Sequence, residues 1–241
     1  MKFKKILKYL LFIVLIGFLC FLYLFTSFRN DRKKVTKIEV KFEEGDNNFL
    51  SHAMVDKLLI QNDKTVTNQA KSVIDLYSLE NNVFKNPYIE KAAVFLTIGG
   101  VLKSIIKQRT PIARIIATKD SYYIDKQGVK IPLSENYSAR VLLVSGVEND
   151  KDIQVVLPLI SYVTEDEFLQ KEIVGIVKSD VDEFEFSVRS GDYKVDFGKL
   201  SNIETKFNKL KAFYNTTYKN KIIQKYKTIT VKYHNQVVCA K

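Results

Sequence analysis

The chain is poor in the residues that build covalent, metal-bound or low-complexity structures. Its 241 residues include 2 Cys, 2 His, 4 Pro, 9 Gly and no Trp. Two Cys cannot form a disulfide framework or a cysteine-rich zinc site, and a histidine-based site would have to use His52 or His234. The scarcity of Pro and Gly excludes collagen-like and low-complexity chains. The 46% of hydrophobic residues is typical of folded domains.

Positive charge is abundant but unevenly placed. The net charge is +11, and a charge of this size is often found in proteins that bind nucleic acid. Residues 1–34 hold eight Lys or Arg against one Asp, and residues 199–241 hold ten Lys against one Glu. The middle of the chain, residues 35–198, is therefore acidic, with a net charge of −5. The C-terminal basic zone is either a solvated helix face or a docking surface for an acidic partner.

A long apolar segment lies near the N-terminus. Residues 9–28 carry no charge, and most of them are Leu, Ile, Phe or Val. A helix of this length spans about 30 Å, the thickness of a hydrocarbon core. A cleaved signal peptide would have a shorter apolar run that ends in small residues, whereas this run ends in Leu24-Phe25-Thr26-Ser27-Phe28. We therefore expect an uncleaved membrane anchor.

The charges that flank the anchor do not decide its orientation. Four Lys precede it and four Lys or Arg follow it closely, so the positive-inside count is a tie. A long C-terminal domain can be exported despite flanking charge, which favours an external location for the bulk of the chain.

The pattern after the anchor predicts a small α+β domain. Ile38, Val40 and Phe42 alternate with charged residues, as in a half-buried strand. Two helices should follow, the first capped by Ser51 with Met54, Val55, Leu58 and Leu59 on one face, the second with Val73, Ile74 and Tyr77 on its apolar face. Asn86-Pro87 should end the second helix, and two strands joined at Gly99-Gly100 complete a β-α-α-β-β order.

A second domain should begin near Arg109-Thr110-Pro111. Tyr122 to Ile131 predicts one hairpin around Asp125-x-x-Gly128, and Phe184 to Phe197 predicts another. Residues 149–171 should be helical with a break near Pro158, and Thr164 with Glu167 could cap the second piece. A later helix has Ile203, Phe207 and Leu210 on its apolar stripe and Lys206, Lys209 and Lys211 on the other face.

Catalytic signatures are absent from the sequence. It contains no phosphate-binding glycine loop, no dinucleotide fingerprint and no nucleophile elbow. Ser104-x-x-Lys107 falls inside a predicted strand and lacks the partner motifs of penicillin-binding enzymes. Neither His52 nor His234 has a nucleophile partner visible in the sequence. We therefore expect no enzyme activity, no metal and no cofactor.

Several segments, by their order and spacing, resemble the FtsQ/DivIB family of bacterial cell-division proteins, the Bacteroidetes-type members in particular. They are the short basic N-terminus with its anchor, Lys37-Ile38-Glu39-Val40, Asn86-Pro87-Tyr88-Ile89, Lys107-Gln108-Arg109-Thr110-Pro111, Tyr122-Tyr123-Ile124-Asp125-x-x-Gly128 and Val231-Lys232-Tyr233-x-Asn235-Gln236-Val237-Val238. One departure is the cytoplasmic tail of only about eight residues.

The resemblance implies a division of the chain and a function. The expected parts are a cytoplasmic tail (1–8), a transmembrane helix (9–28), a linker (29–34), a POTRA-type domain (35–115) and an FtsQ-type β-domain (116–241). It implies a type II protein of the inner membrane, with its C-terminal domain in the periplasm at the division septum. Such a protein is a non-enzymatic scaffold that links early division proteins to septal peptidoglycan synthesis. The implied partners are FtsB-like and FtsL-like proteins and an FtsK-like recruitment partner, and not nucleic acid.

The C-terminal segment is the candidate partner-binding element. Residues 226–233 alternate like a strand, and a strand so close to the chain end is a candidate sheet edge, to which a partner strand can add. In the family, the equivalent of Val231-Lys232-Tyr233 binds partners. The candidate residues are Tyr226, Thr228, Thr230, Val231, Lys232 and Tyr233. The alternative is that this strand only completes the fold, with Tyr233 in the core.

Two other functional classes remain as alternatives. A different membrane-anchored POTRA protein, in outer-membrane assembly or secretion, would usually repeat the module or continue into barrel strands, which this sequence does not show. An exported hydrolase would need a polar catalytic set, and the sequence offers none.

Overall fold

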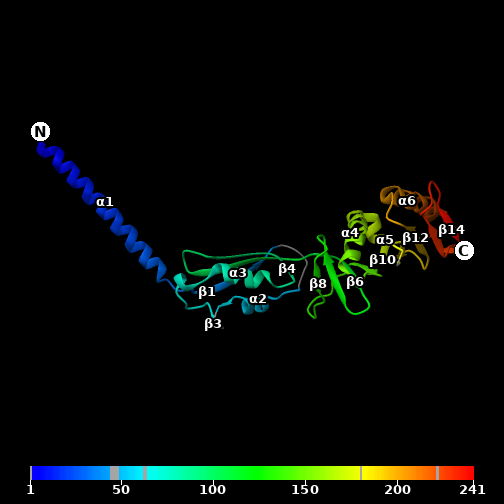
Figure 1. Cartoon of the computed structure of the whole chain (residues 1–241), viewed down its shortest axis with the longest axis horizontal. Helices are drawn as coiled ribbons and strands as arrows, with labels where there is room; N and C mark the ends of the chain where they lie inside the picture. Colours follow the sequence, from blue (N-terminus) through cyan, green and yellow to red (C-terminus); the bar gives the residue numbers. More distant parts are fainter. Residues whose placement is uncertain (1, 44–48, 62–63, 180, 221–222) are drawn as a thin grey trace. The chain divides into compact units, whose positions relative to one another are not determined.

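The chain folds into two compact units. The computed structural model describes residues 2–43, 49–61, 64–179, 181–220 and 223–241. The first unit comprises residues 1–46 and 50–108, and the second comprises residues 47–49 and 109–241 (Figure 1). Because each unit has its own buried cluster of apolar side chains, the two are described separately.

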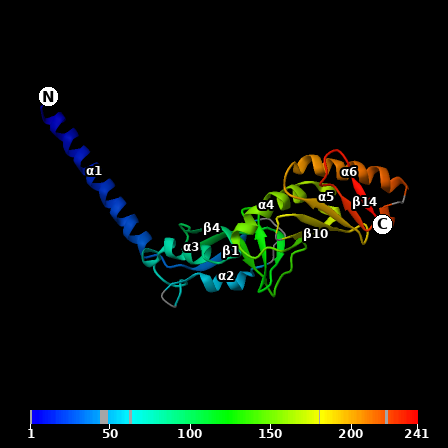
Figure 2. The ribbon, with the colours of Figure 1, turned by 45° about the vertical axis from the view of Figure 1, so that its right-hand side comes forward.

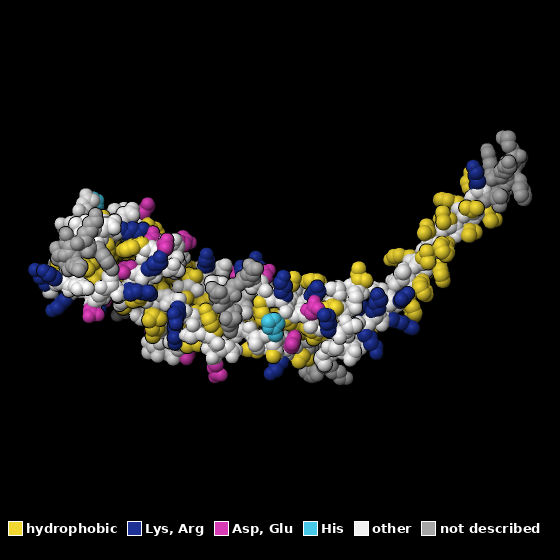
Figure 3. Space-filling view, turned by 180° about the vertical axis from the view of Figure 1, so that it is seen from behind, with side chains coloured by type: hydrophobic (Ala, Val, Ile, Leu, Met, Phe, Trp, Pro, Cys, Tyr) yellow, Lys and Arg dark blue, Asp and Glu magenta, His cyan; other side chains and the backbone are white. Residues whose placement is uncertain are grey.

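Helix α1 (Lys2–Asp31) is the expected N-terminal apolar helix. The stretch Lys8–Asn30 has a mean hydropathy of 2.6, and its apolar side chains are exposed over its length (Figure 3). Its 23 residues measure about 35 Å as a helix, enough to cross a hydrocarbon core. Apolar side chains that no core covers need a non-aqueous surrounding, so α1 fits a single transmembrane span.

The first unit has the predicted β-α-α-β-β order. Its three-stranded sheet has the order β1 (Lys37–Phe42), β5 (Val101–Gln108), β4 (Ile89–Leu96), with β1 parallel and β4 antiparallel to β5. Helices α2 (His52–Leu58) and α3 (Leu76–Phe84) lie between β1 and β4 in the chain, with a short hairpin of β2 (Ile60–Gln61) and β3 (Lys64–Thr65) and the 3-10 turn η1 (Lys71–Val73) between them. Val55, Leu79 and Leu102 are fully buried in the unit's core.

One predicted helix cap is confirmed and one predicted helix face is wrong. Ser51 caps α2 and accepts a hydrogen bond from the Met54 N–H. The second helix, α3, begins later than expected because Asp75 caps it, accepting from the Ser78 N–H. Because α3 starts later, its Leu79 and Val83 side chains point into the core, and Tyr77 is 77% exposed. Val73, predicted on the apolar face, lies in the preceding turn η1.

The second unit is a nine-stranded mixed sheet with helices. The sheet order is β14-β13-β12-β11-β10-β9-β6-β7-β8, and the neighbouring pairs β6/β9, β9/β10 and β12/β13 are parallel. The strands are β6 (Pro111–Ile116), β7 (Ser121–Asp125), β8 (Lys130–Pro132), β9 (Leu142–Ser145), β10 (Ile173–Lys178), β11 (Phe184–Val188), β12 (Lys194–Gly198), β13 (Thr228–Thr230) and β14 (Val238–Ala240). The expected boundary between residues 115 and 116 falls inside β6, which belongs to this sheet.

Three helices cover one face of this sheet (Figures 1 and 2). They are α4 (Asp150–Glu165), α5 (Glu167–Glu172) and α6 (Ile203–Asn220), and the short turn η2 (Ile223–Lys225) follows α6. Side chains from the helices and from alternate strand positions form one core, in which Phe207 of α6 lies 5.8 Å from Phe186 and 4.9 Å from Phe197, ring centroid to ring centroid. The sheet therefore has one buried face.

Two details of the helices differ from the sequence-based expectation. Helix α4 continues through Pro158, and the break comes at Asp166, whose side chain caps α5 by accepting from the Leu169 N–H at 3.0 Å. Thr164 is no cap, because its hydroxyl donates back to the Ile160 carbonyl within α4. Lys206 of α6 is buried rather than solvated: its ammonium lies 4.8 Å from the centre of the Phe197 ring and donates to the Lys199 carbonyl.

A buried polar network joins α6 to the sheet. The Tyr214 hydroxyl of α6 donates to Glu172 Oε1 at 3.0 Å and accepts from the Tyr193 hydroxyl at 2.8 Å. Ser190 donates to the same carboxylate oxygen. Burial raises the pKa of Tyr193 to about 12 and also raises the pKa of Tyr214, so both phenols keep their protons and remain donors.

We expect Tyr214→Phe to lower the free energy of unfolding by about 1 kcal/mol, because it removes one hydrogen bond to a partly buried carboxylate. Glu172→Leu should cost more, about 2 kcal/mol, because the Tyr214 and Ser190 hydroxyls then both lose their acceptor. Urea unfolding of the chain in detergent micelles measures both values. Tyr226→Phe is the control, because its ring packs on Phe213 and its hydroxyl has no place in this network; a loss as large as that of Tyr214→Phe would contradict the role assigned to the network.

Candidate partner-binding edge of the second unit

The nine-stranded sheet has two edge strands of different character. Strand β8 ends the sheet on one side, and its last residue, Pro132, has no N–H to offer to a further strand. Strand β14 ends it on the other side with Val238, Cys239 and Ala240, none of which is charged. Charges and prolines are the usual protection of edges, so β14 is the edge that is open to strand addition.

The predicted partner-binding residues do not lie on one edge strand. Thr228 and Thr230 belong to β13, which runs between β12 and β14 and is therefore covered on both sides. Tyr226 precedes the strand and packs against Phe213 of α6, with 6.2 Å between ring centroids. The expectation that this strand forms the sheet edge is wrong, because β14 folds back and pairs with it, Ile229 opposite Cys239.

The residues after β13 leave the sheet and are held in place. Val231 is fully buried and donates its N–H to the Asp196 carbonyl at 2.9 Å. The Lys209 ammonium of α6 donates to the carbonyls of Val231, at 2.8 Å, and Tyr233. Lys232 forms an ion pair with Asp196 at 2.9 Å. Of these residues, Tyr233 is the accessible one, with 47% of its surface exposed.

Lysines lie at one end of the edge strand β14. Thr228 of β13 pairs with Ala240 of β14, and the Lys227 N–H donates to the Ala240 carbonyl at 2.9 Å. Lys227 and Lys241 therefore lie at the same end of the strand pair. Both are exposed, as is Lys225 in η2. Positive charge beside an uncharged edge favours an acidic partner segment.

Strand β14 is not among the strands predicted from the sequence, although the sequence carries a signal for it. Val237, Val238 and Cys239 form a short apolar run that is typical of a strand. Asn235 before it adopts a positive φ of 56°, a turn conformation that Asn tolerates better than most residues. The turn at 233–235 and the run after it together predict a returning strand.

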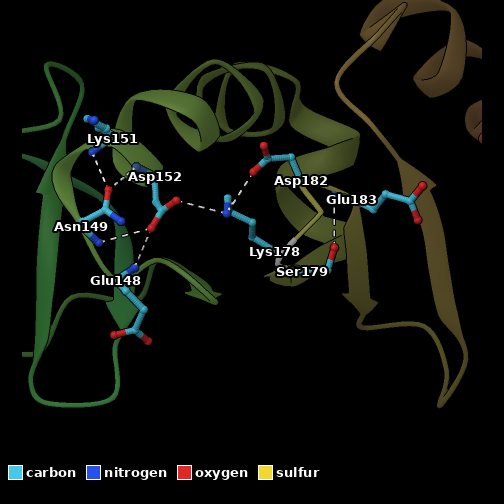
Figure 4. Close-up of polar contacts among 8 residues, drawn as sticks. All are labelled: Glu148, Asn149, Lys151, Asp152, Lys178, Ser179, Asp182 and Glu183. Carbon is cyan, nitrogen blue, oxygen red and sulfur yellow. Dashed lines mark hydrogen bonds and ion pairs between the residues drawn. The ribbon is translucent and has the colours of Figure 1, made fainter.

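A second cluster of charged residues holds the start of α4 (Figure 4). Lys178, at the end of β10, is 8% exposed, and its ammonium lies 3.1 Å from Asp152 and 3.0 Å from Asp182. Asp152 also accepts from the backbone N–H groups of Glu148, at 3.1 Å, and Asn149, at 3.3 Å. Asn149 in turn caps the helix by accepting from the Lys151 and Asp152 N–H groups.

This cluster is arranged for structure rather than for proton transfer. The hydrogen bond with Asp182 raises the pKa of Lys178, which keeps the ammonium charged. Burial raises the pKa of Asp152, but the hydrogen bonds from the Glu148 N–H and from Lys178 lower it by more. The pKa of Asp152 therefore lies below its ordinary value. Both carboxylate oxygens of Asp152 are occupied by donors from the protein itself. Among the described residues, no group of three or more His, Cys, Asp or Glu could hold a metal ion.

These features define a class of protein, an apolar anchor helix followed by two sheet-bearing units, the first of which is POTRA-like. Residues 33–107 match the family model of a POTRA-like domain. Residues 110–240 match the model described as FtsQ/DivIB, C-terminal related. The match covers more than half of the chain, which therefore belongs to the FtsQ/DivIB family of cell-division proteins. No curated protein matches the chain.

We expect Asp152→Asn to lower the free energy of unfolding at pH 7 by about 2 kcal/mol, because it removes the negative charge that pairs with the buried Lys178 and lies in the first turn of α4. The pKa of Asp152 is lowered in the folded state, so its stabilisation is present above its ordinary pKa of 3.8 and is lost as the pH falls below that value. The difference between wild type and variant should therefore shrink below about pH 4. Urea unfolding at several pH values measures it.

The matched control is Asp150→Asn, two residues earlier in the same helix. Its carboxylate pairs with Lys130 at 2.7 Å, but its side chain is 84% exposed. Exposed ion pairs contribute little, so this variant should cost less than about 1 kcal/mol. Equal losses for the two variants would contradict the role of burial in this cluster.

Proposed function

We propose that this chain is a membrane-anchored, non-enzymatic scaffold of the division machinery whose edge strand β14 receives a strand from an acidic partner. The observation that carries the proposal is the open, uncharged edge of β14 with Lys227 and Lys241 at one end. An edge strand supplies backbone hydrogen bonds for affinity, and the lysines steer the partner towards it. The family membership supports a role in cell division.

The partners that we propose for this edge are FtsB-like and FtsL-like proteins. The POTRA-like first unit is then the module that brings the protein to the division site, through an FtsK-like partner. Of the residues predicted from the sequence, Tyr233, Thr228 and Thr230 retain accessible surface beside the edge, whereas Val231 is fully buried. Because Lys232 pairs with Asp196, a charge reversal there would also disturb the fold, and Lys227 and Lys241 are better positions to test.

We expect Lys227→Glu combined with Lys241→Glu to lower the association rate with FtsB-like and FtsL-like partners of the same bacterium by about tenfold at low salt, and by less at high salt. Surface plasmon resonance with the full chain in detergent micelles measures the rate. The control, Lys151→Glu with Lys171→Glu, makes the same change in net charge on the helices α4 and α5. Unchanged association of the folded edge variant, or an equal loss in the control, would refute the assignment of the edge.

The scaffold proposal also places the bulk of the chain outside the cytoplasmic membrane, with α1 as a type II anchor. A C-terminal alkaline phosphatase fusion should therefore be active, because that enzyme needs the oxidising periplasm for its disulfides. A functional fluorescent fusion should gather at the division septum. An inactive phosphatase fusion together with a diffuse membrane signal would overturn this part of the proposal. As a control, the amount of each fusion protein in the cell should be normal.

A further inference from the structure

One face of the sheet in the second unit is not covered by any helix of the described residues. Along each strand, alternate residues point into the core, and Ile115, Val144 and Ile176 are fully buried there. The residues between them point to the opposite side, which we call the open face. Its members are Arg114, Ile116, Leu143, Ser145, Gly175, Val177, Glu185, Ser187, Lys194 and Asp196.

Strand register aligns these residues in two rows across the sheet. Arg114 pairs with Leu143, which pairs with Gly175, and Gly175 pairs with Ser187. In the second row, Ile116 pairs with Ser145 and Ser145 pairs with Val177. Neighbouring strands lie about 4.8 Å apart, so the small residues of the rows adjoin the large apolar ones directly.

A hollow lies where the small residues meet. Ile116, Leu143 and Val177 surround Gly175, Ser145 and Ser187, and the hollow has a volume of about 190 Å³. This is smaller than the cavities of about 300–1,000 Å³ that take drug-sized ligands, and it suits single side chains. Ile116 is 45%, Leu143 45% and Val177 41% exposed, a concentration of apolar surface on an otherwise polar face.

The charges on the open face are neutralised except at one position. Lys194 pairs with Glu185 at 2.6 Å, and Asp196 pairs with Lys232 at 2.9 Å. Arg114 lies beside Leu143, which lines the hollow, and within the described residues it has no ion pair. Its Nε is buried without a hydrogen-bond partner, and its guanidinium lies 5.9 Å from the centre of the Tyr123 ring. A guanidinium that has no ion pair and is partly desolvated forms its strongest hydrogen bonds with a carboxylate.

We propose that the open face is a second docking surface, separate from the β14 edge, for a partner peptide segment that carries a large apolar side chain and a neighbouring Asp or Glu. The apolar side chain fills the hollow over Gly175, and the carboxylate pairs with Arg114. The combination gives specificity, because a segment with only one of the two groups leaves either the hollow or the guanidinium unmatched.

A second copy of this chain does not fit this surface as well. A two-fold symmetric contact would place the same residues on both sides of the interface. The acids of this face, Glu185 and Asp196, already pair with Lys194 and Lys232, so a second copy would have no unpaired acid of this face to offer to Arg114. The unpaired charge therefore points to a chemically different segment.

The test begins with a random peptide library displayed on phage and selected on the full chain in detergent micelles. We expect the enriched peptides to share a large apolar residue close to Asp or Glu. Synthetic copies of an enriched peptide, measured by fluorescence anisotropy, should bind Leu143→Ser and Arg114→Met about tenfold more weakly than wild type. Arg114→Met keeps the aliphatic stem and removes only the charge, and thermal unfolding checks that each variant is folded.

Two controls separate this surface from the rest of the molecule. Val155→Ser changes an exposed apolar residue on α4, and it should leave binding unchanged. Replacing the acidic residue of the peptide by Lys should abolish binding to wild type and restore it to Arg114→Glu. Enriched peptides without an acidic residue, binding that survives both Leu143→Ser and Arg114→Met, or no enrichment at all would overturn the proposal. Peptides that respond only to Lys227→Glu would belong to the β14 edge and would also count against it.

Discussion

The burial of one face of the nine-stranded sheet beneath α4, α5 and α6 is the constraint on which the second unit depends. The aromatic contacts among Phe186, Phe197 and Phe207 join two strands to α6. Because side chains alternate along a strand, burying one set fixes the other set on the opposite face. The open face is thus a consequence of where the helices pack.

Several lysines of the C-terminal region stabilise the fold and are not free to bind a partner. Lys206 and Lys209 donate to backbone carbonyls, and Lys211 and Lys232 pair with Asp166 and Asp196. Each of these contacts satisfies a carbonyl or a carboxylate that would otherwise need water. Among the described lysines, Lys227 and Lys241 are exposed at the same end of β13 and β14, and they give that end of the edge its positive character.

A scaffold needs surfaces that are chemically distinct, so that partners do not compete for the same place. The anchor α1 presents apolar side chains, the POTRA-like unit presents its own sheet, and the edge β14 and the open face of the second unit differ in chemistry. An edge offers backbone groups, and a hollow near a cation offers sites for side chains. The two docking surfaces that we propose would therefore take chemically different segments.

The sequence by itself determined the anchor, the β-α-α-β-β order of the first unit and the hairpins of the second, because these depend on local periodicity, capping and turn residues. Ser51 and the Asp125-x-x-Gly128 turn are examples, and the Gln127 and Val129 N–H groups both donate to Asp125 in the folded turn. The start of α3 was misplaced, because Asp75 competes as a cap with the apolar pattern before it. Only the tertiary structure decided that Lys206 is buried and that Arg114 and Leu143 are brought together beside the hollow at Gly175. Those facts depend on contacts between elements far apart in the sequence, and no local pattern of residues encodes which strand will lie beside which.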